Sequence, residues 1–182
     1  YDTDISQNEN IYIALKDIQS NEKSTLTNIQ NKVLENEIRD FKLSGCHLDN
    51  NKKKRLEEIS LRLSELSHKF SLNLLNATNE FEMIIDNFED VKEIPASDLE
   101  LAKFEEDGIT KYKFTLQAPS YSAYITYGTS REKREELYKG YCTRAPQNGK
   151  IIEELLALKN EKSKILGFNS YAQYSLATKM AS

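Results

Sequence analysis

The sequence has few of the residues that break helices. It contains six glycines, three prolines and no tryptophan in 182 residues. Folds built from short strands need many turns, so this scarcity argues against an all-β class. Charged residues make up 30% of the chain and hydrophobic residues 38%, a balance that suits amphipathic helices with wide solvated faces. No apolar run approaches the roughly 18–20 residues needed to cross a membrane, and no signal peptide opens the sequence.

Cysteine is also scarce, and positive charge is not in excess. Cys46 and Cys142 are too far apart for a Cys-x-x-Cys pair and make no disulfide framework, which indicates a reduced, cytoplasmic setting. The net charge of −4 argues against a protein that binds nucleic acid. The basic run at residues 52–55 is followed by Glu57 and Glu58, which favours a solvated helical turn over a phosphate site.

The clearest pattern lies between about residues 50 and 87. Its apolar positions are Leu56, Ile59, Leu63, Leu66, Phe70, Leu74, Ala77, Phe81 and Ile84. They recur at gaps of 3 and 4 that average 3.5 residues, the period that keeps one stripe against a partner helix. Because neither proline nor glycine interrupts the pattern, it predicts a helix of about 35 residues.

Shorter patterns predict further helices, several with recognisable ends. Gly45 and Gly167 are expected C-terminal stops, and Ser97, Ser130 and Ser170 are expected N-caps. The ranges are 8–20, 24–44, 97–104, 119–127, 131 to about 144, 150–166 and 171–180. Together with the long helix, they predict a mainly helical chain.

Residues 109–117 differ from the rest because apolar and polar side chains alternate there, which predicts one extended segment. No second strand is evident, so we expect its partner outside this sequence. The predicted class is therefore all-α, with long antiparallel helices and at most one short strand pair. Residues 1–92 are expected to form a helical arm and residues 93–182 a second helical region.

The two ends of the sequence read as internal. Tyr1-Asp2-Thr3 does not supply an initiating Met, and Lys179 to Ser182 shows no terminating pattern. We therefore expect the chain to be a segment of a larger protein.

Motifs for catalysis are missing. A hydrolytic zinc site places two histidines four residues apart on a helix with a glutamate between them. The only histidines, His47 and His68, are 21 residues apart. His68 is expected to be exposed or hydrogen-bonded on the long helix, and His47 to lie in a loop. The sequence thus predicts no catalytic residue and no metal ligand in this chain.

One constellation has the residue types of a binding surface. Arg131, Arg134, Tyr138 and Tyr141 follow at gaps of 3, 4 and 3 and share a helical face, with Arg144 one turn further. Arginine and tyrosine can bind peptide carboxylates and backbone groups, as in a substrate channel. They can equally form a structural network in which arginine pairs with glutamate and stacks on tyrosine rings, which is the simpler reading.

A family pattern runs along the whole chain. The segments that carry it are Gln7–Asn10, Arg39–Gly45, Glu58–Ser67, Lys69–Phe70, Asn76–Thr78, Thr115–Tyr121 and Ile151–Ala181. In one further helix it is carried by Arg131, Arg134, Tyr138, Tyr141, Thr143, Arg144 and Ala145. With them the sequence resembles the oligopeptidase A and thimet oligopeptidase family of zinc metallopeptidases. It departs from the family at Glu93-Ile94-Pro95 and in a short turn at residues 146–149.

The resemblance implies a cytoplasmic enzyme that cleaves short peptides in a channel between two helical lobes. The zinc ligands of the family lie on a His-Glu-x-x-His helix, and no position here matches it. The chain would then form part of the channel wall, with the zinc in the parent enzyme, and would be inactive alone.

The alternative is a stand-alone helical interaction module that binds a partner helix through the 3.5-residue stripe. In either case, exposed apolar helix faces would let the isolated chain self-associate. The extended segment has no evident partner strand, and both ends of the sequence resemble the interior of a longer chain. Both observations favour a peptidase segment over a stand-alone module.

Overall fold

A computed structural model describes residues 5 and 8–180 of the chain. Tyr1–Thr3, Gln7, Ala181 and Ser182, which were used above for the chain ends and the family pattern, lie outside the described residues. The protein is mainly helical, as predicted. It forms two compact units: unit 1 is Tyr1–Glu65 with Glu153–Ser182, and unit 2 is Leu66–Ile152. These limits differ from the division at residue 92 that the sequence pattern suggested.

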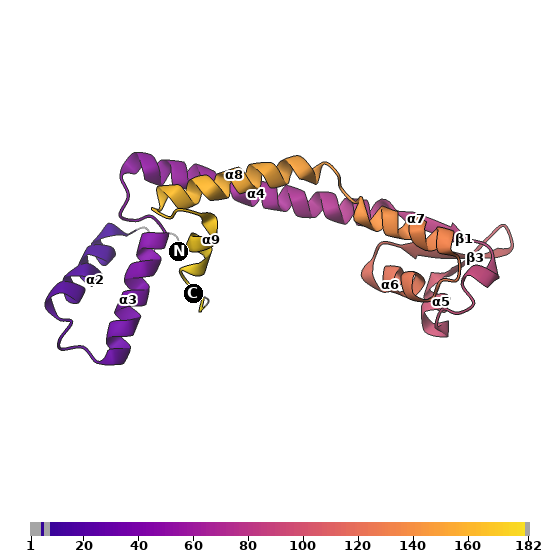
Figure 1. Ribbon diagram of the computed structural model, residues 1–182, viewed down its shortest axis with the longest axis horizontal. Coiled ribbons are helices and arrows are strands. Elements are labelled where there is room, and N and C mark those ends of the chain that lie inside the picture. Colours follow the sequence, from indigo (N-terminus) through magenta and orange to yellow (C-terminus); the bar gives the residue numbers. More distant parts are fainter. Residues whose placement is uncertain (1–4, 6–7, 181–182) are drawn as a thin grey trace. The chain divides into compact units, whose positions relative to one another are not determined.

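Unit 1 opens with the helix pair α2 (Glu9–Asn21) and α3 (Asn28–Leu43), which lie side by side (Figure 1). α3 begins four residues later than the pattern predicted from position 24, because Thr27 and Gln30 form a capping box that fixes its start. The chain leaves α3 through Gly45, whose φ of 83° is the left-handed conformation expected of a helix-ending glycine.

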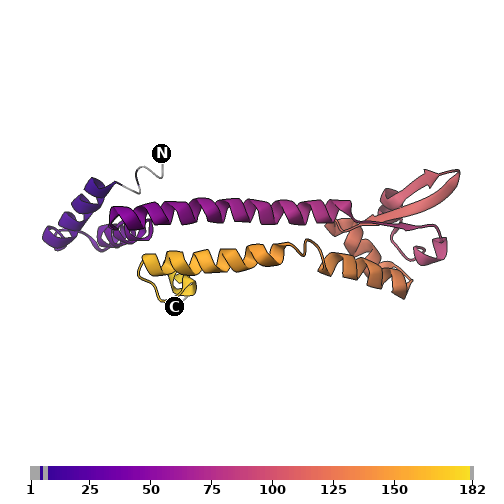
Figure 2. The ribbon, with the colours of Figure 1, turned by 90° about the horizontal axis from the view of Figure 1, so that it is seen from above.

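The long helix α4 (Asn50–Glu80) and the later helix α8 (Asn148–Ile165) each extend over both units, and their unit 1 parts run side by side (Figure 2). Ion pairs between them join Arg55 to Glu161 and Arg62 to Glu154. The residue numbers rise along α4 while they fall along α8, so the two helices are antiparallel, as predicted.

The predicted end of the long helix near residue 87 is wrong, because α4 stops at Glu80. The residues that follow form strand β1 (Glu82–Ile85), whose backbone pairs with a strand about thirty residues later. Phe81 and Ile84 fit the apolar spacing of the helix, but Phe81 lies just after α4 and Ile84 lies in β1.

The buried hydrophobic side chains of unit 1 lie on α3, in the turn after it and on the first half of α4. They include Leu34, Ile38, Phe41, Cys46, Leu56 and Ile59. The unit ends with α9 (Tyr171–Leu176), whose N-cap is the predicted Ser170; the Ser170 hydroxyl accepts a hydrogen bond from the Gln173 N–H. Gly167, with a φ of 86°, ends the segment after α8 as expected.

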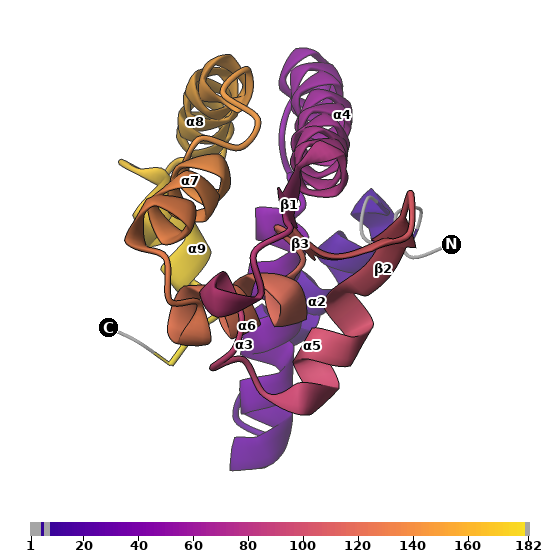
Figure 3. The same cartoon turned by 90° about the vertical axis from the view of Figure 1, so that its right-hand side faces the viewer.

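Unit 2 is built on an antiparallel sheet of three strands in the order β1-β3-β2. β2 is Lys103–Glu106 and β3 is Ile109–Thr115. The central strand is the predicted extended segment, and its partners lie within this chain: Glu82 pairs with Thr115 and Lys103 with Tyr112 (Figure 3). The expectations of a partner outside the sequence and of at most one strand pair were therefore wrong.

Helices α5 (Ala96–Ala102), α6 (Ala118–Tyr127) and α7 (Arg131–Cys142) complete unit 2, with a 3-10 turn at Phe88–Asp90. α5 follows Pro95 and has no side-chain cap, so the predicted Ser97 cap is wrong, and Phe104 belongs to β2. The hydrophobic core joins one face of the sheet to these helices. Its most buried members are Met83, Val91, Phe114, Leu116, Tyr124 and Leu137.

In the described part of the chain, no helix is both long and apolar enough to span a membrane.

Candidate functional site

Helix α7 carries most of the predicted arginine and tyrosine constellation. The Ser130 hydroxyl accepts a hydrogen bond from the Lys133 N–H, which confirms the predicted cap. Leu137 is fully buried in the core of unit 2. Because it anchors one face of α7, Arg131 and Tyr138 are exposed on other faces of the helix. α7 ends at Cys142, so Arg144 lies in the turn after the helix rather than on a further helical turn.

Three of the five residues line one shallow hollow on unit 2. Arg131, Arg134 and Tyr138 surround it together with Glu135, and its volume is about 360 Å³. We call it the α7 hollow. Arg134 also donates a hydrogen bond to the backbone carbonyl of Gly128, the residue that ends α6. The Arg134 side chain therefore joins α7 to α6, whereas the Tyr138 side chain is 55% exposed.

The other two residues belong to a different cluster, which we call the tyrosine–arginine stack. The Tyr141 ring stacks on the Tyr121 ring at 4.3 Å between centroids. On Tyr141 the Arg144 guanidinium lies 3.7 Å from the ring centroid. Arg144 Nε donates to the Tyr141 carbonyl at 2.9 Å, and Arg144 Nη1 donates to Thr78 Oγ1 at 3.2 Å. Arg144 thus stacks on a tyrosine ring, as in the structural alternative, but its acceptors are a carbonyl and a hydroxyl rather than a glutamate.

The tyrosines of the two clusters are not suited to acid–base catalysis near neutral pH. Burial raises the pKa of the Tyr121 phenol above its ordinary value of 10.0. A hydrogen bond with the Cys142 side chain, the main cause, raises the pKa of Tyr138 above 10.0 as well. Both phenols therefore stay neutral and act as hydrogen-bond donors or acceptors. Together with the guanidinium groups, they can bind a carboxylate or a peptide backbone.

Two members of the stack, Tyr121 and Thr78, were not expected from the sequence. Tyr121 lies on α6, and Thr78 lies near the end of α4, 66 positions before Arg144. The sequence spacing of Tyr121 and Thr78 does not predict these contacts, because the residues come together only when the chain folds.

The described residues do not form a zinc site. Across residues 5 and 8–180, no group of three His, Cys, Asp or Glu side chains is placed to hold a metal ion. His68 is exposed on α4, and His47 lies in the turn before α4, with its ring 6.3 Å from the Tyr12 ring. A hydrolytic zinc needs three protein ligands that converge, so these residues do not fit one.

Two family models match opposite ends of the chain. Residues 1–53 match the N-terminal domain of neurolysin and thimet oligopeptidase. Residues 124–182 match peptidase family M3. Oligopeptidase A of Haemophilus influenzae is 43% identical over an alignment that covers 100% of this chain. The chain belongs to peptidase family M3.

Two other oligopeptidases A are also similar to nearly the whole chain. Oligopeptidase A of Escherichia coli is 38% identical and covers 100% of the chain. A probable cytosolic oligopeptidase A of Arabidopsis thaliana is 35% identical and covers 97%. The chain spans about a quarter of the length of these relatives, 28% of both bacterial proteins and 27% of the plant protein. The residues that line the α7 hollow lie in the region that the M3 model matches, as do Tyr141 and Arg144 of the stack, whereas Tyr121 and Thr78 lie before it.

Proposed function

We propose that this chain is a non-catalytic segment of a zinc-dependent oligopeptidase that hydrolyses short peptides. In this proposal it forms part of the wall of a channel between two lobes. The observation that carries the proposal is the 43% identity to an oligopeptidase A along the whole chain.

The zinc of such an enzyme would be held by residues outside this chain. The described histidines, cysteines and carboxylates form no three-ligand group, so we assign no step of hydrolysis to them. The 182-residue chain alone is then expected to bind no zinc and to be inactive.

The α7 hollow is the part of the chain that we propose to face peptides. Arg131 is exposed, and a guanidinium can hold a peptide carboxylate through two parallel hydrogen bonds. Tyr138 adds a neutral phenol for a backbone carbonyl or N–H. The Arg134 contact with Gly128 and the stack of Tyr141 with Arg144 support structural roles for these three residues, which would hold the hollow in place.

The partners follow from the same proposal. Short peptides would be the substrates, and the location would be the cytoplasm, in line with the free Cys46 and Cys142 and with the cytosolic relative of Arabidopsis. The isolated chain would also self-associate. On α3, Ile29 is 78% exposed and Val33 is 53% exposed, one helical turn apart, and together they offer an apolar surface to a second copy.

Zinc content and peptide hydrolysis, measured on the 182-residue chain and on the full-length protein, test the proposed activity. Zinc and hydrolysis are expected only in the full-length protein. Stoichiometric zinc with hydrolysis by the 182 residues alone would overturn the proposal. A full-length protein without peptidase activity would favour the helical interaction module instead.

Substitutions in the full-length protein test the peptide-facing role of the α7 hollow. Arg131→Gln and Tyr138→Phe are expected to raise KM by about three- to tenfold with little change in kcat, since they remove uniform binding. Lys133→Gln is the control, because Lys133 lies on α7 but pairs with Glu136 and does not line the hollow. If both hollow variants keep the KM of the parent, the hollow does not face peptides.

A further inference from the structure

Unit 1 contains a cavity that the proposed peptidase role does not use. It lies between the end of α3, the first half of α4, α8 and α9, and its volume is about 1020 Å³. All the residues that line it belong to unit 1. We call it the α3–α9 cavity. It is large enough for a small organic ligand, because such sites commonly measure about 300–1,000 Å³.

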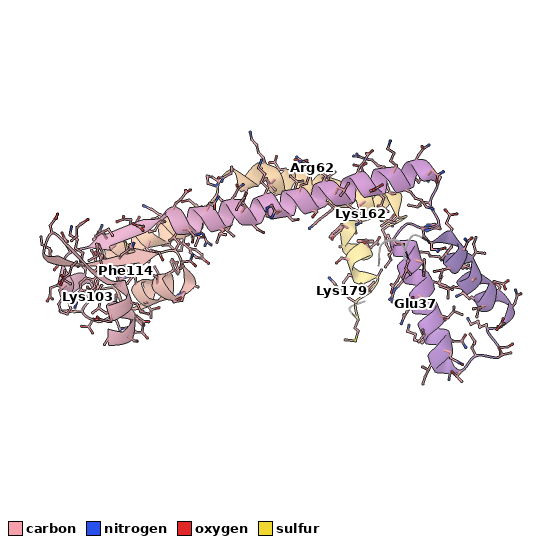
Figure 4. The ribbon with its side chains drawn as sticks, turned by 180° about the vertical axis from the view of Figure 1, so that it is seen from behind. Glu37, Arg62, Lys103, Phe114, Lys162 and Lys179 are labelled. Carbon is pink, nitrogen blue, oxygen red and sulfur yellow. The ribbon has the colours of Figure 1, made fainter. Side chains whose placement is uncertain are left out.

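The notable member of its wall is Lys162, on the side of α8 that faces α4 and α9 (Figure 4). Lys162 Nζ lies 3.5 Å from Ser60 Oγ, at the limit of a hydrogen bond. It also lies 5.9 Å from the centroid of the Tyr174 ring. These neighbours are a hydroxyl and an aromatic face, and neither neutralises an ammonium group.

The electrostatic state of Lys162 follows from this setting. Burial lowers the pKa of its ammonium below the ordinary value of 10.5. The neighbouring carboxylate on α8, Glu161, forms an ion pair with Arg55 of α4 and not with Lys162. A partly desolvated cation of this kind is stabilised by an anion brought into the cavity.

The rest of the wall is polar and suits an anionic group. Hydroxyls come from Ser60, Ser64, Tyr174 and Thr178. Two more ammonium groups line the cavity, that of the exposed Lys54 and that of Lys53, which is paired with Glu9. Two carboxylates also line the cavity. Asp40 already forms an ion pair with Arg39 at 2.9 Å, and Glu57 is exposed one turn before Ser60 and Leu61 on α4.

We propose that the α3–α9 cavity is a binding site for a small organic anion whose carboxylate or phosphate group is held by Lys162. The Ser60 hydroxyl adds a hydrogen bond to the anionic group, and Lys54 attracts the ligand at the mouth of the cavity. Leu43, Leu56 and Leu61 supply an apolar surface for the body of the ligand. The site is separate from the α7 hollow, which lies in unit 2, and it does not depend on the proposed peptidase function.

Titration of the full-length protein with two probes tests this site and identifies the anionic group. The probes are inorganic phosphate and succinate. Binding is followed by NMR of lysines methylated with ¹³C, in which the amine keeps its charge. The signal of Lys162 is assigned by its loss in Lys162→Arg, and saturable shifts of this signal are expected with one probe or both. A stronger response to succinate identifies a carboxylate ligand, and a stronger response to phosphate identifies a phosphate ligand.

Matched variants decide whether Lys162 holds the anion. Because Lys162→Met and Lys162→Arg lack the Lys162 signal, isothermal titration calorimetry with the same probes compares binding among the variants. Lys162→Met is expected to weaken binding by at least about tenfold, equal to about 1.4 kcal/mol. Lys162→Arg should retain most of the binding, since it keeps the charge. Lys164→Met is the control, because Lys164 is exposed on the same helix and does not line the cavity. Circular dichroism verifies that each variant is folded. The proposal fails if neither probe shifts the Lys162 signal, or if the two Met variants weaken binding equally.

Discussion

Arg62 on α4 holds Glu154 on α8 through two hydrogen bonds, of 2.6 Å from Nε and 3.1 Å from Nη2. The same arrangement recurs seven residues away, where Arg55 holds Glu161 at 2.7 and 2.9 Å. Seven residues are two turns of an antiparallel helix pair whose contacts repeat every 3.5 residues. The repeated pair therefore selects one register between α4 and α8 within unit 1.

Exchanging the charges of one pair should test this register. Glu154→Arg alone places two arginines together and is expected to lower Tm, while Arg62→Glu with Glu154→Arg should recover most of the loss. The effect should be a few degrees at most and should shrink at high salt, because both side chains are more than 40% exposed. Thermal unfolding at low and high salt measures it. Equal losses in the single and double variants would show that the pair does not couple.

The core of unit 2 should respond strongly to the loss of Phe114. Its side chain is 1% exposed, and its ring lies 4.7 Å from that of Tyr124. Phe114→Ala is expected to lower the free energy of unfolding by about 3–5 kcal/mol, because it leaves a cavity in a packed core. Phe88→Ala removes a ring that is 53% exposed, so it should cost less than about 1 kcal/mol. Urea unfolding compares the two, and similar losses would contradict this assignment of the core.

The turn between α3 and α4 should require glycine at position 45 for two reasons. Gly45 has a φ of 83°, and a Cβ there would lie 2.6 Å from Leu56 Cδ2. Gly45→Ala is therefore expected to cost about 2–4 kcal/mol, the sum of backbone strain and crowding. Gly108 has a similar φ of 74° but nothing within 4 Å of the added atom. Gly108→Ala should thus cost only the strain, about 1–2 kcal/mol. Equal costs in denaturant unfolding would show that the contact with Leu56 is unimportant.

The stability of unit 1 should fall in mild acid because of His47. Partial desolvation of the largely exposed ring, and then the charges of Lys42, Lys53 and Lys52, lower the pKa of His47 below its ordinary value of 6.5. As the pH falls below about 6.5, the unfolded chain takes up a proton at His47 before the folded chain does. The free energy of unfolding therefore decreases with falling pH until the folded imidazole is also protonated, and then levels off.

Replacing His47 should flatten this part of the pH profile. His47→Gln is expected to reduce the loss of stability between pH 7 and about pH 5, measured by urea unfolding at each pH. His68→Gln, on the exposed side of α4, is the matched control for the loss of a histidine. An unchanged slope in His47→Gln would show that His47 does not cause the acid sensitivity.

Much of the helical framework could be predicted from short sequence patterns. Ser130 and Ser170 cap the helices they were expected to cap, and Gly45 and Gly167 have the left-handed φ of helix-ending glycines. These features depend on residues within one or two turns, so the sequence reports them directly. The apolar stripe of α4 likewise predicted a partner helix, because its period is a property of one element.

The tertiary structure decided what depends on distant residues. α4 ends at Glu80 because Glu82 pairs with Thr115, and β2 forms because Lys103 pairs with Tyr112. The predicted constellation is divided between two clusters for the same reason. Tyr141 stacks on Tyr121, and Arg144 donates a hydrogen bond to Thr78. Arg131 and Tyr138 remain exposed. The sequence by itself determined the helices and the family pattern. Strand pairing and side-chain contacts across long separations form only in the folded chain, and they determined the sheet, the stack and the cavity around Lys162.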